Sequence, residues 1–102
     1  MATVSKLLTK TQITKYLKNL DGWLLSTKGV SLQQTFQFKD HVSALVFIAR
    51  ITVHVQVLNH HPEINFTFKK VKVTLTTHDL KGISSLDIQL AKRIEQLQKK
   101  SG

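Results

Sequence analysis

The sequence predicts one α+β domain in the order α-β-β-α-β-β-α, with a four-stranded antiparallel sheet and helices packed on one face. Apolar residues recur at helical spacing in three segments, and runs of strand-forming residues lie in pairs between these segments. The length of 102 residues and the hydrophobic fraction of 41% fit a single compact domain. We expect this domain to span residues 1–102, with its core at about residues 9–97.

The first half of the chain predicts a helix followed by a β-hairpin. Thr9 and Gln12 match a capping box, which starts a helix over about residues 10–20. A strand-like run begins at Trp23, and a second run covers residues 30–38 with alternating polarity toward its end. Turn signals precede each run, so we expect the two runs to form a hairpin.

Residues 41–59 predict the longest helix, and Asp40 is its expected N-cap. The segment is rich in Val, Ile and Thr, but about 19 residues without Gly or Pro are too long for a typical strand. One apolar stripe should face the sheet, and it comprises Ala44, Phe47, Ile48, Ile51, Val55 and Leu58. Because other sides are apolar as well, we expect a subunit interface at Val42, Leu45, Ala49, Val53 and Val57.

The second half repeats the ββα arrangement. Pro62 ends the long helix, and strands are expected at about residues 64–68 and 71–77. A loop follows, and Ser84 with Asp87 three residues later resembles a helix start. One face of this last helix should be apolar, and it comprises Leu86, Leu90, Ala91, Ile94 and Leu97.

The composition limits the classes of function. A net charge of +9 raises the question of nucleic-acid binding, but the lysines are scattered, and no RNA-binding aromatic motif accompanies them. We interpret them as a solvated basic surface and expect no direct nucleic-acid partner. The absence of cysteine excludes a disulfide framework and a thiolate metal site. The sequence contains no run of 18 or more apolar residues, which argues against a membrane span. The basic N-terminus fits either a folded helix or a transit peptide.

Three of the five histidines lie close together in the sequence. His60 and His61 follow the long helix and His78 ends a strand, so the imidazoles converge if that strand runs beside the helix end. A pair of histidines can act as general acid and general base near neutral pH, as a dehydration requires. Asp87 could orient one imidazole from behind.

Alternative interpretations of these residues stay open. Adjacent histidines after a helix are often surface residues, and Asp87 by itself is a helix-capping residue. A three-histidine zinc site is less favoured, because adjacent residues rarely point at one ion, and we expect no metal. We interpret His41 and His54 as helix-surface or partly buried residues. The pairs Phe36/Phe38 and Phe66/Phe68 are interpreted as core residues rather than stacking platforms.

The histidines belong to a longer pattern. It comprises Gly22-Trp23, Phe36-Gln37-Phe38-Lys39-Asp40, Ala44, Phe47, His60-His61-Pro62-Glu63, Thr76-Thr77-His78, Gly82 and Asp87-Ile88-Gln89-Leu90-Ala91. This pattern resembles the signature of the pterin-4a-carbinolamine dehydratases, and it covers nearly the whole chain, from about the first predicted helix to Glu95. Some members of that family also serve as dimerisation cofactors of a homeodomain transcription factor.

The resemblance implies a metal-independent hydro-lyase that needs no cofactor, because the pterin is its substrate. Such an enzyme removes water from a 4a-hydroxytetrahydropterin, the product of aromatic amino acid hydroxylases, and so recycles the hydroxylase cofactor as quinonoid dihydropterin. By position, the resemblance makes His60 and His78 the acid/base pair, while His61 holds the pterin and shares in proton transfer. The pterin pocket would be lined by Asn59, Thr76, Thr77, His78 and Asp79.

The resemblance also implies partners and a location. Family members form homodimers or homotetramers through helices and sheet edges, and a transcription-factor partner is the alternative role. We expect a cytoplasmic protein, with nuclear and organellar locations left open. The chain departs from the family pattern at Gln56, Asn59, Ile64 and Phe68, where Glu, Asp, an aromatic residue and Tyr are common. The first two departures remove negative charge beside the histidines.

Overall fold

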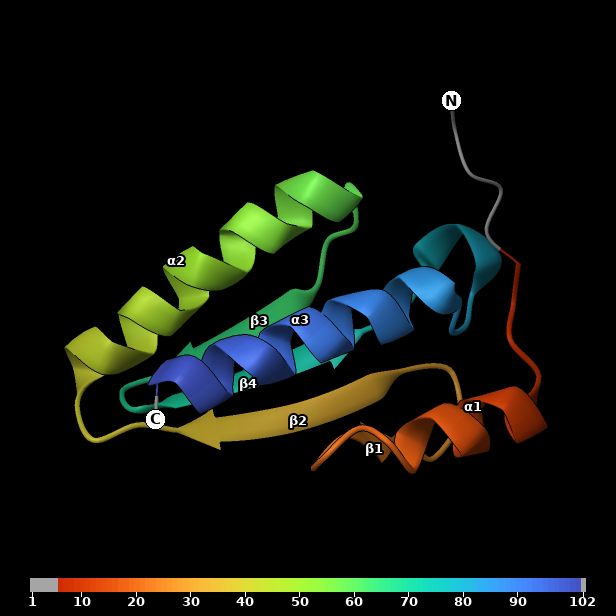
Figure 1. The fold of residues 1–102 in the computed structure, drawn as a ribbon, viewed down its shortest axis with the longest axis horizontal. Helices are drawn as coiled ribbons and strands as arrows, with labels where there is room; N and C mark the ends of the chain where they lie inside the picture. Colours follow the sequence, from red (N-terminus) through yellow and green to blue (C-terminus); the bar gives the residue numbers. More distant parts are fainter. Residues whose placement is uncertain (1–5, 102) are drawn as a thin grey trace.

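In the computed structural model, which describes residues 6–101, the helices and strands follow the predicted order (Figure 1). The elements are α1 (Lys10–Leu17), β1 (Leu24–Leu25), β2 (Leu32–Gln37), α2 (His41–Leu58), β3 (Glu63–Thr67), β4 (Lys70–Leu75), the short 3-10 helix η1 (His78–Leu80) and α3 (Ser85–Ser101). The predicted α+β class with a four-stranded antiparallel sheet is therefore confirmed.

The sheet has the strand order β1-β2-β4-β3, so the two hairpins join through β2 and β4. Leu32 pairs with Leu75 at one end of that central pairing, and Gln37 pairs with Lys70 at the other. Side chains alternate along β4: Val71 and Val73 are fully buried, whereas the lysines between and before them are exposed. One face of the sheet is therefore apolar and covered, and the other is polar and open to solvent.

The core lies between the apolar face of the sheet and the two long helices. Figure 1 shows α2 and α3 on the same side of the sheet, with α1 at the end nearest β1. Phe47 of α2 and Ile94 of α3 are both buried in this core. Trp23 packs edge-on against Phe36 at a centroid distance of 6.1 Å, which fixes the first hairpin beneath the helices.

The helix α2 has one buried stripe and one exposed apolar stripe. The predicted sheet-facing residues Ala44, Phe47 and Ile51 are buried, and Ile48, Val55 and Leu58 are partly buried against the core. The exposed stripe, hereafter the α2 outer stripe, comprises Val42, Leu45, Val46, Ala49, Val53 and Val57. The length and apolar composition of α2 would be sufficient for a membrane-spanning helix, but helices that pack on a protein core can have the same length and composition.

Several predicted boundaries were too wide. α1 ends at Leu17 rather than near residue 20, because the chain turns there and buries Leu20 in the core. β1 has only two residues, and β4 ends at Leu75 rather than Thr77. Thr76 and Thr77 do not continue the β-ladder, because the Thr76 hydroxyl donates to Val30 O and the Thr77 N–H donates to Gly82 O.

The interpretation of Phe66 and Phe68 as core residues was wrong. Phe68 is 66% exposed and has φ 52 in the β3–β4 turn, so its ring points away from the core. Phe66 lies on the edge strand and is 36% exposed. His41 stacks on Phe66 at a centroid distance of 4.8 Å. The other pair follows the prediction, with Phe36 buried and Phe38 partly buried against Phe47.

Candidate active site

The end of α2 sends its two histidines into different environments. Asn59 adopts a left-handed conformation with φ 49, and its N–H donates to Gln56 O at 3.3 Å, which closes the helix. His60 follows this cap and is only 8% exposed, whereas His61 is exposed. One imidazole is thus fixed inside the protein, and its neighbour is accessible to solvent and ligand.

The buried imidazole is held by a buried carboxylate. Nε2 of His60 lies 2.5 Å from Oδ1 of Asp87, and the two side chains are 10% and 0% exposed. A carboxylate only accepts hydrogen bonds, so Nε2 carries the hydrogen of this pair, and in the neutral ring the lone pair is then on Nδ1. Within residues 6–101, Nδ1 has no hydrogen-bond partner. The contact with Asp87 therefore fixes the orientation of the His60 ring, with Nδ1 on the side away from the carboxylate.

The second oxygen of Asp87 is held just as firmly. Oδ2 accepts from the Thr77 hydroxyl at 2.8 Å and from the Ser84 backbone N–H at 2.9 Å. The Ser84 and Thr77 hydroxyl oxygens are 2.6 Å apart, and Thr77 already donates to the carboxylate, so Ser84 is the donor in that pair. All of these groups are buried. The predicted capping arrangement at Ser84 and Asp87 is thus part of the site itself.

The hydroxyl groups of Thr76 and Thr77 are both used inside the protein. Thr76 donates to Val30 O at 2.6 Å and to Gly82 O at 3.3 Å, which ties the end of β4 to the first hairpin. Thr77 donates to Asp87. Either residue can therefore offer a ligand its backbone and methyl group more readily than its hydroxyl.

A pocket of about 260 Å³ lies where these elements meet. It is lined by Asn59, His60, His61, Thr76, Thr77, His78, Asp79 and Leu86. All seven residues predicted from the sequence as catalytic or pocket-lining are therefore brought together. His78 and Asp79 lie in η1 and are exposed, as is His61. Asp87 stands behind His60 and does not line the pocket.

The eighth lining residue, Leu86, was assigned differently from the sequence. We predicted it in the apolar face of the last helix, but it is only partly buried and contributes to the pocket wall. Leu86 lies in the first turn of α3, two residues after Ser84. This position near the helix start is the sequence signal that distinguishes Leu86 from the core residues later in the helix. Ile88 and Leu90 take the buried positions instead.

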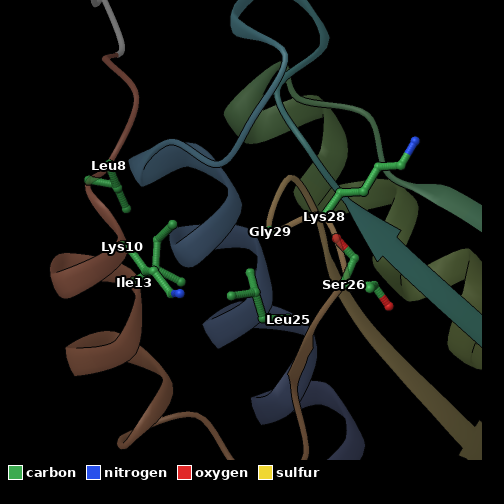
Figure 2. Close-up of a pocket in the computed structure, with 8 residues that line it drawn as sticks. Leu8, Lys10, Ile13, Leu25, Ser26, Lys28 and Gly29 are labelled. Atoms are coloured by element: carbon green, nitrogen blue, oxygen red, sulfur yellow. The ribbon is translucent and has the colours of Figure 1, made fainter.

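A different cleft, of about 320 Å³, lies between the start of α1 and the turn after β1 (Figure 2). Leu8 and Ile13 line one side of it, and Leu25 lies across from them. Its walls contain no histidine or carboxylate. Of these two cavities, the smaller one is lined by histidines and the larger one is not.

The departures from the family pattern lie mostly outside the pocket. Gln56, Ile64 and Phe68 do not line it, while Asn59 does. Among residues 6–101, no group of three or more His, Cys, Asp or Glu side chains is arranged to hold a metal ion. The titratable side chains that line the pocket are three imidazoles and the exposed carboxylate of Asp79, and such groups are capable of proton transfer.

Comparisons with known proteins identify the family of this chain. The family model described as pterin 4 alpha carbinolamine dehydratase matches residues 6–97. A relative from Sulfurisphaera tokodaii is 40% identical over 92 residues, which are 90% of this chain and 97% of the relative. A relative from Rhizobium meliloti is 39% identical over 84 residues, which are 82% of this chain and 81% of the relative. Both are provisionally named pterin-4-alpha-carbinolamine dehydratases.

Solved structures share the fold. The crystal structure of a transcriptional coactivator/pterin dehydratase from Brucella melitensis has a TM-score of 0.87 and 33% identity, and the match covers 90% of this chain and 98% of that one. A pterin dehydratase-like RuBisCO assembly factor of the alpha-carboxysome has a TM-score of 0.65 at 23% identity, which is a likeness of fold alone. The match over residues 6–97, together with these identities, shows that the chain belongs to the pterin-4a-carbinolamine dehydratase family.

Proposed function

We propose that this protein dehydrates a 4a-hydroxytetrahydropterin to the quinonoid dihydropterin. The observation that carries the proposal is the meeting of His60, His61 and His78 around one pocket, with His60 held by Asp87. Membership of the dehydratase family supports the same reaction. The product would return to the aromatic amino acid hydroxylases as recycled cofactor.

The reaction requires two proton transfers and no change of oxidation state. The C4a–O bond breaks as the leaving hydroxyl takes a proton and departs as water. The nitrogen lone pair at N5 forms the C4a=N5 double bond, and the N5 proton passes to a base. Each positioned proton-transfer group contributes about 10²–10⁴-fold. Imidazoles are suitable for both steps near neutral pH.

The hydrogen bonding of the histidines supports a division of roles. His60 has its Nε2 hydrogen engaged by Asp87, so its Nδ1 acts as the base toward the N5 proton. His78 is exposed on η1, and it would deliver the proton to the leaving hydroxyl. His61 would hold the pterin ring across the pocket and share in proton transfer. Asn59 and Asp79 would contact the polar edge of the pterin.

We also propose that the reaction needs no metal ion. Proton transfer by two positioned imidazoles accounts for the chemistry without a Lewis acid. The test is the dehydration rate before and after treatment with a strong chelator and removal of the chelator by dialysis. An unchanged rate supports the proposal. A rate that falls with chelation and returns when one divalent metal is added overturns it.

A second function, as an interaction protein, is favoured by one specific observation. The α2 outer stripe presents Val42, Leu45, Val53 and Val57, each at least half exposed, along the whole helix. An apolar stripe of this kind is typical of a surface covered by another chain. We propose that it joins two or more copies of this protein. The name of the Brucella melitensis structure suggests a coactivator role as the alternative use of the same surface.

A further inference from the structure

The chain segment before α1 contacts the loop that builds the histidine site. The Leu8 N–H donates to Ile83 O at 2.9 Å, and Leu7 forms an isolated antiparallel bridge with Ser84. The Leu7 side chain also lies over Gly82, where its Cδ2 is 2.7 Å from the position that a Cβ would take. Leu7 and Leu8 therefore lie along residues 82–84, and the Leu7 side chain occupies the space that a larger residue at position 82 would need.

Residues 82–84 are the link between this segment and the catalytic imidazole. Gly82 O accepts from the Thr77 N–H at 2.7 Å, which closes the loop around η1. Ser84 gives its backbone N–H to Asp87 and pairs its hydroxyl with Thr77. Asp87 in turn holds His60. A displacement of the loop would thus change both hydrogen bonds that fix Oδ2 of the carboxylate.

Leu8 anchors the segment to the body of the protein. It is partly buried against the core, and Figure 2 shows it above Ile13, on the extended segment that leads into α1. Leu7, by contrast, is 51% exposed, although its side chain covers a buried glycine. An exposed leucine contributes little to the core, so contact with the loop is the interaction that its side chain makes here.

We propose that Leu7 is a positioning residue of the histidine site, which acts through Gly82 and Ser84 on Asp87 and so on the tautomer and orientation of His60. The part of this inference that concerns turnover rests on the proposed dehydratase function. The part that concerns His60 does not, because the imidazole N–H can be observed without substrate.

The test compares Leu7→Ala with the wild type in two measurements. In NMR spectra of protein labelled with ¹⁵N-histidine, we expect the His60 Nε2–H to exchange with water about tenfold faster in the variant, because the loop opens more often. In the dehydration assay, kcat should fall about tenfold with KM nearly unchanged, because the base is misplaced while the pocket remains. Leu7→Met, which restores a similar volume, should restore both values.

Leu24→Ala is the matched control, because Leu24 is an exposed leucine on β1 that touches no part of the site. It should change neither measurement. Wild-type exchange and wild-type kcat in Leu7→Ala would overturn the proposal. If the wild type shows no dehydration at all, the exchange measurement still decides the positioning role, and the dehydratase function fails separately.

Gly82→Ala provides an independent test of the contact. The added methyl group would stand 2.7 Å from Leu7 Cδ2 and should displace that side chain, so exchange at His60 should accelerate as in Leu7→Ala. The double variant removes the clash and should be no worse than Leu7→Ala alone. If the effects of Leu7→Ala and Gly82→Ala on His60 exchange add fully in the double variant, the two residues act separately, and the proposal is contradicted.

Discussion

His60 and Asp87 form a buried pair in which Nε2 lies 2.5 Å from Oδ1, with the carboxylate fully enclosed. The pair joins the end of α2 to the first turn of α3, two elements that are 27 residues apart in sequence. Its geometry resembles the way in which an aspartate fixes the histidine of a hydrolase triad. The carboxylate selects the tautomer, and the opposite ring nitrogen remains available for the reaction.

Asp87→Asn should separate orientation from folding. The amide fills the same space, but one of its two groups is a donor, so it cannot accept from His60, Thr77 and Ser84 as the carboxylate does. We expect kcat to fall about 10²-fold or more, as in tautomer-disrupting variants of other enzymes. Stability should fall by about 1–3 kcal/mol, measured by urea unfolding. Asp21→Asn, at an exposed aspartate, is the control, and an equal loss of kcat there would refute the orienting role.

His60→Ala and His61→Ala should differ in stability although the residues are adjacent. Removal of His60 leaves the buried Asp87 carboxylate without the N–H that donates to Oδ1, which should destabilise the fold by about 3–5 kcal/mol. Removal of the exposed His61 should change stability by no more than about 0.5 kcal/mol. Thermal and urea unfolding of both variants measures the difference. Equal stabilities would mean that the buried pair contributes nothing to the fold.

The α2 outer stripe should control self-association. Val53→Lys places a charge at a position that is 60% exposed in the isolated chain, so the monomer should fold normally. If the stripe is covered by another copy, the same charge becomes buried there, and the assembly should dissociate. Light scattering coupled to size-exclusion chromatography gives the molecular mass. Thr35→Lys, at an exposed position of the central strand β2, is a control for added charge. A wild type that stays monomeric at high concentration would exclude the interface.

Asp40 should give α2 an acid-sensitive cap. The Ser43 backbone N–H donates to its carboxylate at 2.7 Å and, with the Ser43 side chain, holds the pKa of Asp40 below its usual value of 3.8. A lowered folded pKa means that this stabilisation is present above about pH 4 and is lost as pH falls through the folded pKa. Asp40→Asn keeps a capping acceptor but cannot titrate. Its stability should therefore change less than that of the wild type below pH 3.8, as followed by circular dichroism.

The sequence was sufficient for the fold class, because helices and strands depend on local patterns, whereas the pocket-lining residues were expected from the resemblance to a known family. The stripe at Ala44, Phe47 and Ile51 indicated the buried side of α2 directly. The spacing of Ser84 and Asp87 indicated a helix start, and a helix start placed a carboxylate near the ends of α2 and β4. Short-range rules therefore reached the elements and the helix start at Ser84, while the resemblance supplied the residues expected at the pocket.

Burial within the site depends on long-range geometry that no local pattern contains. Nothing in the pair His60-His61 shows which imidazole is buried, because the left-handed turn at Asn59 decides it. Thr76 and Thr77 were expected to line the pocket, but their hydroxyls donate to Val30 and Asp87, which are groups from other parts of the chain. Phe68 looked like a core residue because the alternation of its strand continues to it, but the chain has already turned at that residue.

The central claim is that the three histidines of the pocket together perform the dehydration, and variants of its two exposed members, His61 and His78, test it most directly. Both side chains are exposed, so a double His61→Gln/His78→Gln variant should fold and melt like the wild type, whereas loss of His60 would confuse chemistry with stability. The measurement is the dehydration of 4a-hydroxytetrahydropterin followed by ultraviolet absorbance. We predict rapid dehydration by the wild type and a loss of at least about 10²-fold in the folded double variant. Equal rates for the two proteins, or a wild type that does not exceed the uncatalysed reaction, would contradict the account.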